Sequence, residues 1–111
     1  MQTERMPDGS IVEQAAGFGT IKCGELAGSA TALVMPTVTC RMVNFKAVAS
    51  NAGNVYIGGA AVTKVDGTTD VTTGLELAAG QETGWLLVDN LNRFYRICDN
   101  AGDDLTYLAL G

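Results

Sequence analysis

The sequence contains no histidine among its 111 residues. Histidine is the commonest proton carrier near neutral pH, and it is the base in the Ser-His-Asp and Cys-His catalytic arrangements. Its absence excludes these arrangements and removes the commonest ligand of transition metals. The cysteines, Cys23, Cys40 and Cys98, have no Cys-x-x-Cys spacing that would suggest a metal site. We therefore expect a protein that is not an enzyme and that uses no metal and no cofactor.

Charged residues are scarce, at 17% of the chain, and the formal net charge is −5. The basic residues are scattered and form no stripe that could follow a phosphate backbone, so nucleic acid is excluded as a partner. The sequence has no run approaching the roughly 20 apolar residues of a membrane helix, and its N-terminus lacks the apolar core of a signal peptide. We expect synthesis in the cytoplasm, no membrane partner, and buried free thiols in place of disulfides.

Proline is rare, with 2 copies, whereas glycine occurs 14 times and 47% of the residues are hydrophobic. This composition predicts a packed domain whose chain turns often, as short antiparallel strands do. The clearest strand pattern covers residues 40–49. Val43, Phe45 and Ala47 alternate onto one face of this segment, and Lys46 lies on the other.

Turn signals separate further strand candidates at intervals of about 8–12 residues, and we expect eight or nine strands in total. The segments with strand character are residues 18–26, 31–34, 40–49, 55–57, 61–65, 69–72, 75–78, 85–88, 93–98 and 105–110. Residues 50–54 are expected to close a tight hairpin between two of them, and Asp66 with Gly67 another. The fold predicted for residues 18–111 is an all-β, antiparallel β-sandwich, jelly-roll-like, preceded by an extended N-terminal arm at residues 1–17.

Two turns have similar sequences, Asn-Ala-Gly-Asn at residues 51–54 and Asn-Ala-Gly-Asp at residues 100–103. Internal duplication would explain the similarity, but independent use of the same turn chemistry is the simpler explanation. The second turn is acidic, and Asp99, Asp103 and Asp104 could offer oxygen ligands to calcium. Their spacing does not match an EF-hand loop. We interpret them as turn residues whose side chains bond the backbone.

Two late segments have apolar side chains on both faces. In residues 85–88, Trp85 and Leu87 alternate with Leu86 and Val88. The last segment repeats the pattern, with residues 105, 107 and 109 on one side and residues 108 and 110 on the other. One face of a sandwich sheet normally meets water, so these outward faces need cover. The N-terminal arm, a twin subunit or a larger partner could supply it.

Aromatic, arginine and large apolar side chains contribute most to protein interfaces. The residues that we expect to carry contacts of this kind are Arg5, Met6, Ile11, Phe18, Tyr56, Trp85, Leu87, Arg93, Tyr95, Tyr107, Leu108 and Leu110.

From residue 40 to residue 111 the chain resembles a family of small head proteins of tailed bacteriophages, the capsid cement or decoration proteins. The similarity is in the running order of several segments: residues 43–47, 54–59, 75–83 and 88–91, then the closing Asn-Ala-Gly turn with residues 105–108. Residues 1–39 have no clear counterpart. The resemblance implies a compact β-sandwich carried on virions as a cement, staple or fibre-base module.

A cement protein binds the outside of an assembled capsid and clamps neighbouring subunits of the major capsid protein. The resemblance therefore implies a location on the capsid surface of the virion, with the major capsid protein as partner. It also implies a homodimer, because cement proteins often occupy local two-fold positions. We expect the outward faces of the two late strands to form the dimer seam and residues 1–17 to lace onto the shell. The alternative is a receptor- or carbohydrate-binding module of a phage fibre or tail, because jelly rolls also serve as lectins.

Overall fold

A computed structural model describes residues 19–111, and the predicted arm at residues 1–17 lies outside them. Within the described residues the chain forms eight β-strands and a short 3-10 helix, Leu91–Arg93. The strands are β1 (Ile21–Leu26), β2 (Leu33–Val34), β3 (Met42–Ala47), β4 (Val55–Gly58), β5 (Leu75–Leu77), β6 (Leu86–Leu87), β7 (Tyr95–Cys98) and β8 (Leu105–Leu110).

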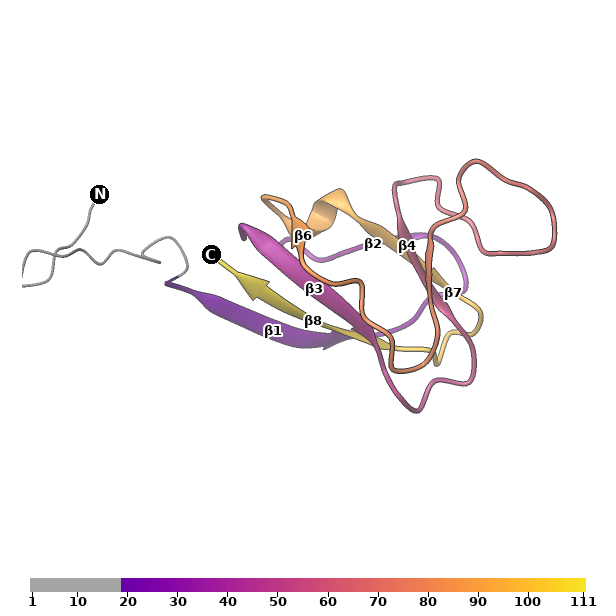
Figure 1. Ribbon diagram of the computed structural model, residues 1–111, viewed down its shortest axis with the longest axis horizontal. Coiled ribbons are helices and arrows are strands. Elements are labelled where there is room, and N and C mark those ends of the chain that lie inside the picture. The colour runs from indigo at the N-terminus through magenta and orange to yellow at the C-terminus, as the bar shows by residue number, and fades with distance from the viewer. Residues whose placement is uncertain (1–18) are drawn as a thin grey trace, which may run out of the picture.

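The strands form two four-stranded sheets, with the orders β1-β8-β3-β6 and β2-β7-β4-β5 (Figure 1). Every strand pair within them is antiparallel. The structure is therefore all-β with two antiparallel sheets, as expected for a β-sandwich. Successive strands alternate between the two sheets, except β4 and β5, which are neighbours in the same sheet.

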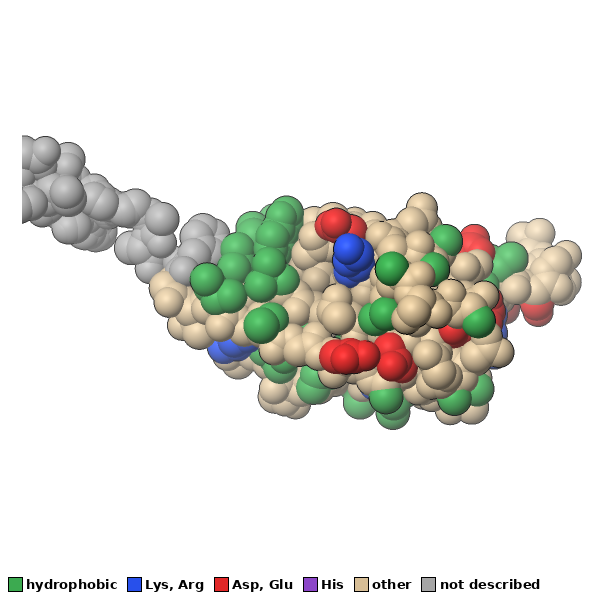
Figure 2. All heavy atoms as spheres, turned by 90° about the horizontal axis from the view of Figure 1, so that it is seen from below, with side chains coloured by type: hydrophobic (Ala, Val, Ile, Leu, Met, Phe, Trp, Pro, Cys, Tyr) green, Lys and Arg blue, Asp and Glu red, His purple; other side chains and the backbone are tan. Residues whose placement is uncertain are grey.

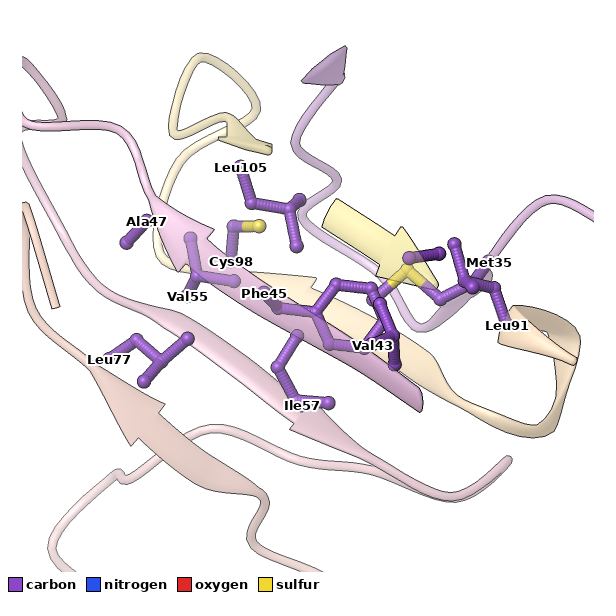
Figure 3. Packing of buried hydrophobic residues seen from close by; sticks show 11 residues of the cluster. Met35, Val43, Phe45, Ala47, Val55, Ile57, Leu77, Leu91, Cys98 and Leu105 are labelled. Atoms are coloured by element: carbon purple, nitrogen blue, oxygen red, sulfur yellow. The ribbon is translucent and has the colours of Figure 1, made fainter. Parts of the chain in front are cut away.

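The core lies between the two sheets. Val43, Phe45 and Ala47 of β3 are fully buried, so the face predicted from alternation is confirmed. They meet buried side chains from the opposite sheet, including Val55 and Ile57 of β4 (Figure 3). The Phe45 ring also packs edge-on against Phe94, with the ring centroids 5.6 Å apart.

The expected hairpin at residues 50–54 is wrong. β3 pairs with β6 and β8, whereas β4 pairs with β5 and β7, so residues 48–54 carry the chain from one sheet to the other. Residues 99–104 do the same between β7 and β8. A hairpin would place the apolar sides of β3 and β4 next to each other in one sheet. The crossover lets them face each other across the core, which removes more apolar surface from water.

The two crossovers lie side by side and are joined by polar side chains. Asp103 is 1% exposed, and its carboxylate accepts hydrogen bonds from the backbone amides of Ala52 and Gly53, both at 3.0 Å, and of Asn100 at 2.9 Å. The Asn51 side chain bonds the backbone of Asp104 in both directions, accepting from its N–H at 2.9 Å and donating to its C=O at 2.7 Å. The acidic turn is therefore a structural link between the crossovers. No group of three or more potential metal ligands occurs within residues 19–111.

Residues 59–74 form a long loop that projects beyond the sheets (Figure 1). The strands expected at residues 61–65 and 69–72 are absent from it, and one isolated bridge joins Thr63 to Thr73. Aspartate side chains bond the loop backbone instead: Asp66 accepts from the Thr68 amide and Asp70 from the Thr72 amide, both at 2.9 Å. Such local bonds compete with strand pairing, which explains the difference from the prediction.

Arg96 of β7 is a buried cation, with 6% of its surface exposed. Its guanidinium donates to the backbone carbonyls of Ala27 at 3.0 Å and Val34 at 3.1 Å. Burial lowers its pKa. Arg96 therefore links β7 both to its neighbour β2 and to the segment that follows β1.

Replacing Asp103 with asparagine should destabilise the fold by roughly 2–3 kcal/mol, because an amide group would meet backbone donors that now bond a buried carboxylate. Urea denaturation at neutral pH measures the loss. Asp66→Asn is the control: Asp66 is exposed, and its replacement should cost less than about 0.5 kcal/mol. Equal losses for the two variants would contradict a joining role for Asp103.

The same carboxylate should make stability depend on acid pH. Burial raises the pKa of Asp103, but the hydrogen bonds from Gly53, Asn100 and Ala52 more than offset it, and the pKa lies below its ordinary value. The stabilisation is therefore complete above the unfolded-state pKa of about 3.9 and is lost as the pH falls through the folded-state value. Denaturation series at several pH values should show the gap between the native chain and Asp103→Asn closing in this acid range.

Candidate functional site

The outward surface of the β1-β8-β3-β6 sheet has an apolar end. The strand register places Ile21, Leu110, Met42 and Leu87 in one row across the four strands. Leu108 follows Leu110 on the same side of β8, two residues back. These residues, Ile21, Met42, Leu87, Leu108 and Leu110, are called the apolar face below.

The apolar face is open to solvent in the described chain. Leu87 is 81% exposed, Ile21 69% and Leu108 39%, while Met42 and Leu110 are partly exposed. Trp85, which precedes β6, is 47% exposed. Figure 2 looks at the molecule from the side on which β1 and β8 lie in Figure 1. It shows hydrophobic side chains gathered at the end where the described chain begins, with charged side chains further along.

Polar residues occupy the other end of the same sheet surface. Glu25, Thr106 and Lys46 form a row in register across β1, β8 and β3, and Glu82 is paired with Lys46 by an isolated bridge. A shallow hollow of about 250 Å³ lies here, lined by Asn44, Lys46, Glu82, Thr106, Tyr107 and Leu108. The Asn44 amide donates to the Glu82 carboxylate at 2.8 Å. The sheet surface thus changes from apolar to charged along the strands.

The sequence predicts apolar side chains on both faces of two late strands, and the structure confirms this for β6 and β8. Leu86 and Val88 pack against the core, whereas Leu87 points outward. In β8, Leu105 and Ala109 are fully buried and Leu108 is exposed. Leu87, Leu108 and Leu110, named from the sequence, come together on one sheet surface.

Tyr56 and Tyr107, which were expected to form part of an interface, point away from the apolar face. Tyr56 is only 2% exposed, and its hydroxyl donates to the Asp99 carboxylate at 3.3 Å. Burial also raises its pKa. Tyr107 lies on the inner side of β8 with Leu105 and packs against the core. A Cβ built on Gly24 would come within 3.1 Å of the Tyr107 ring, so the two strands are closely packed there.

The remaining predicted residues lie away from the apolar face or outside the described chain. Arg93 is exposed and pairs with Asp89, with 3.0 Å between Nε and Oδ1, and this bond lowers the pKa of Asp89. Tyr95 is partly buried on β7, in the second sheet. Arg5, Met6, Ile11 and Phe18 lie outside residues 19–111.

Sequence reasoning missed Ile21 and Met42. Alternation indicates only that both point outward: Ile21 shares a side of β1 with Cys23 and Glu25, and Met42 shares a side of β3 with Lys46. The expectation of buried thiols is also wrong for Cys23, which is exposed on this surface. It holds for Cys98, which is fully buried, whereas Cys40 is partly buried and donates to the Val88 carbonyl at 3.3 Å.

A second hollow, of about 460 Å³, lies between β4, β5 and the long loop. It is lined by Ile57, Gly58, Gly59, Ala60, Ala61, Val62, Val71, Thr72, Thr73, Gly74 and Leu75. This lining contains no carboxylate, amine, guanidinium or thiol. Its hydroxyl groups are those of Thr72 and Thr73, and the Thr72 hydroxyl donates to the Asp70 carboxylate at 2.7 Å.

No model of a protein family, no curated protein and no solved structure matches this chain. The helix present in residues 19–111 is too short to cross a membrane. The feature with the clearest chemistry is the apolar face, which can bury hydrophobic surface against another macromolecule.

The two sides of β6 should respond differently to charge. Leu87→Lys should change the free energy of unfolding by less than about 0.5 kcal/mol, because this side chain is already in water. Leu86→Lys should cost more than roughly 2 kcal/mol, because it places an ammonium group against the core. Denaturant unfolding at low protein concentration measures both changes. Similar losses would mean that the outward and inward sides are assigned incorrectly.

Proposed function

We propose that this chain is a structural virion protein that binds the outside of an assembled phage capsid and clamps neighbouring subunits of the major capsid protein. The observation that carries the proposal is the apolar face, which leaves Leu87 and Ile21 largely in water on a small β domain. Exposed apolar surface of this kind is typical of protein-binding sites. The resemblance of residues 40–111 to capsid cement proteins gives the class of partner.

The strand order supports a jelly-roll assignment, which the proposal includes. A jelly roll has eight strands in two sheets, and its chain passes back and forth between them. The orders β1-β8-β3-β6 and β2-β7-β4-β5 have this alternating character. Edge strands β1 and β6 contribute Ile21 and Leu87 to the apolar face, so a partner seated there would also cover the sheet edges.

The mechanism that follows is thermodynamic linkage. A subunit that binds the assembled shell but not its separated parts stabilises the shell by RT ln(1 + [L]/Kd) at each site. Individual contacts can be modest, because a shell repeats them many times and a clamp that touches two subunits gains from its second contact. The net charge of −5 helps to keep the free protein soluble before it binds.

We propose that residues 1–17 attach the protein to the capsid. The described chain begins at Gly19, next to the apolar face, because Ile21 belongs to that face. The first 17 residues include Arg5, Met6 and Ile11, which are residue types that contribute to protein contacts. A segment attached at this position can extend from the face to a neighbouring subunit.

Deleting residues 1–17 should abolish binding to capsids and leave the fold intact, because the core lies within residues 19–111. Co-sedimentation with intact capsids that lack this protein measures binding, and circular dichroism with a melting curve checks the fold. Separated capsid subunits are the control and should not bind the full chain. Unchanged binding of the truncated chain would show that residues 1–17 are not needed for capsid binding.

The isolated full chain can also be used to distinguish the cement function from the alternative function. A receptor- or carbohydrate-binding module would bind glycans or host cells as an isolated protein, with the exposed Trp85 ring as a stacking surface. A glycan array probed with the full chain tests this directly. Glycan binding that is lost in Trp85→Ala, together with no affinity for capsids, would replace the cement proposal.

A further inference from the structure

The β1 edge of the first sheet is open. Within residues 19–111, β1 is the end strand of the order β1-β8-β3-β6 and pairs only with β8. It is 6 residues long, whereas β6 at the other edge has 2. A long strand with an unpaired edge is a template for another strand. We infer that residues 10–16 of the same chain fill this position as an additional antiparallel strand, joined to β1 by a turn at residues 17–18.

The hydrogen bonds to β8 show which backbone groups of β1 are free. Gly111 donates its amide to the Thr20 carbonyl at 3.0 Å, and the two residues are opposite each other when the β1-β8 register is continued by one position. Hydrogen-bonded pairs alternate along antiparallel strands. The even-numbered residues of β1 therefore bond β8, whereas Ile21, Cys23 and Glu25 direct their backbone amides and carbonyls toward the open edge.

The sequence before β1 fits a turn in this phase. The residues that flank a two-residue hairpin turn bond each other. A turn at residues 17–18 is flanked by Ala16 and Gly19. Gly19 lies two positions before Ile21, so its backbone groups also face the open edge. A turn shifted by one residue would end at a residue that faces β8 instead. Gly17 is the glycine that a type II′ turn needs at its first central position.

The turn determines the register, and the register places opposite charges together. Glu13 lies opposite Lys22, on the side of the sheet away from the apolar face. The Lys22 amine donates to the Thr39 carbonyl at 2.6 Å and to the Thr39 hydroxyl at 3.0 Å, but it forms no ion pair within residues 19–111. The Glu13 carboxylate supplies the missing negative charge directly across the strand pair, which stabilises the pair.

The same register places Ile11 opposite Gly24. The Tyr107 ring covers this glycine, because Gly24 and Tyr107 are partners across β1 and β8 and a Cβ built on Gly24 would come within 3.1 Å of the ring. Ile11 beside Gly24 therefore reaches the edge of the ring, and β-branched side chains pack well against aromatic ones across strands. Gly9 and Pro7 end the segment, since proline cannot donate to a strand ladder.

The same chain is the favoured occupant because residues 1–18 enter the described structure next to this edge. Closing a short turn costs less entropy than binding a strand of another molecule, which loses translational and rotational freedom. Residues 1–9 lie beyond the added strand and stay available for the capsid contact proposed above. The strand and capsid binding can therefore be tested separately.

Amide hydrogen exchange of the free protein, measured by NMR, tests the added strand. The Cys23 and Glu25 amides should exchange roughly tenfold or more slowly in the full chain than in the chain without residues 1–17, because hydrogen bonds protect them. The Lys22 and Gly24 amides, which bond β8, are the internal control and should be protected in both chains. Equal exchange of Cys23 and Glu25 in the two chains would overturn the inference, whether or not the deletion abolishes capsid binding.

A disulfide tests the register. Val12 lies opposite Cys23, whose thiol is exposed. The Cα atoms of such a hydrogen-bonded pair are about 5.5 Å apart, a distance that a disulfide spans. Glutathione disulfide, which takes up the electrons released, should link Cys23 to Val12→Cys in roughly tenfold higher yield than to Ile11→Cys, whose side chain points to the other face.

Non-reducing gels and peptide mapping identify the linked residues and show whether they belong to one chain. A disulfide within one chain is the expected product. A disulfide between two chains would assign the edge to a second copy, and equal yields for the two variants would mean that residues 10–16 have no fixed register. Either result would overturn the inference.

Discussion

The structure depends on the connection between two neighbouring crossovers. β3 and β4 lie in different sheets, as do β7 and β8, and the turns that join them are held together by the buried Asp103 carboxylate. A buried charge is costly unless hydrogen bonds compensate it, and here backbone amides of both turns do so. Gly53 is required at this contact, since a Cβ there would approach Asp99 Cβ to 2.6 Å. The separation of the chain into two facing sheets, and hence the core between them, follows from this connection.

The two-sheet arrangement also determines which residues remain outside. Once Val43 and Phe45 point into the core, the alternate positions of β3 must point outward, and the pairing of β3 with β8 and β6 sets Met42 beside Leu110 and Leu87. The same residues could not be buried in this fold without turning the core residues out. The apolar face is therefore a direct result of the register that builds the core, and its cover has to come from another molecule or another segment.

Which side of each strand is buried could be predicted in part from the sequence, because the alternation of apolar and polar residues is a local property. It correctly assigned the buried side of β3 and placed Leu86 and Leu87 on opposite faces of β6. The hairpin at residues 50–54 was wrong because asparagine and glycine suit a tight turn and a crossover equally well. What separates the two outcomes is the contact with Asp103 and Asp104, which are distant in sequence.

The burial of Tyr56 could not be predicted either, because it also depends on contacts with residues that are distant in sequence. It lies on the side of β4 opposite to Val55 and Ile57, where alternation predicts exposure, and neighbouring groups such as Asp99 enclose it. The apolar face was predicted only in part. Met42 shares its side of β3 with Asn44 and Lys46, and these polar neighbours suggested a polar, solvent-exposed surface. Recognising it required the pairing of strands that are far apart in the chain.

The loop at residues 59–74 has a practical consequence for engineering. Its internal hydrogen bonds run between its own aspartate and threonine residues, and Val71 in it is almost completely exposed. Insertions into such surface segments cost little free energy, because closure entropy grows slowly with length. A foreign peptide placed there would project away from both sheets, which makes this loop the natural point for inserting a peptide that has to stay accessible.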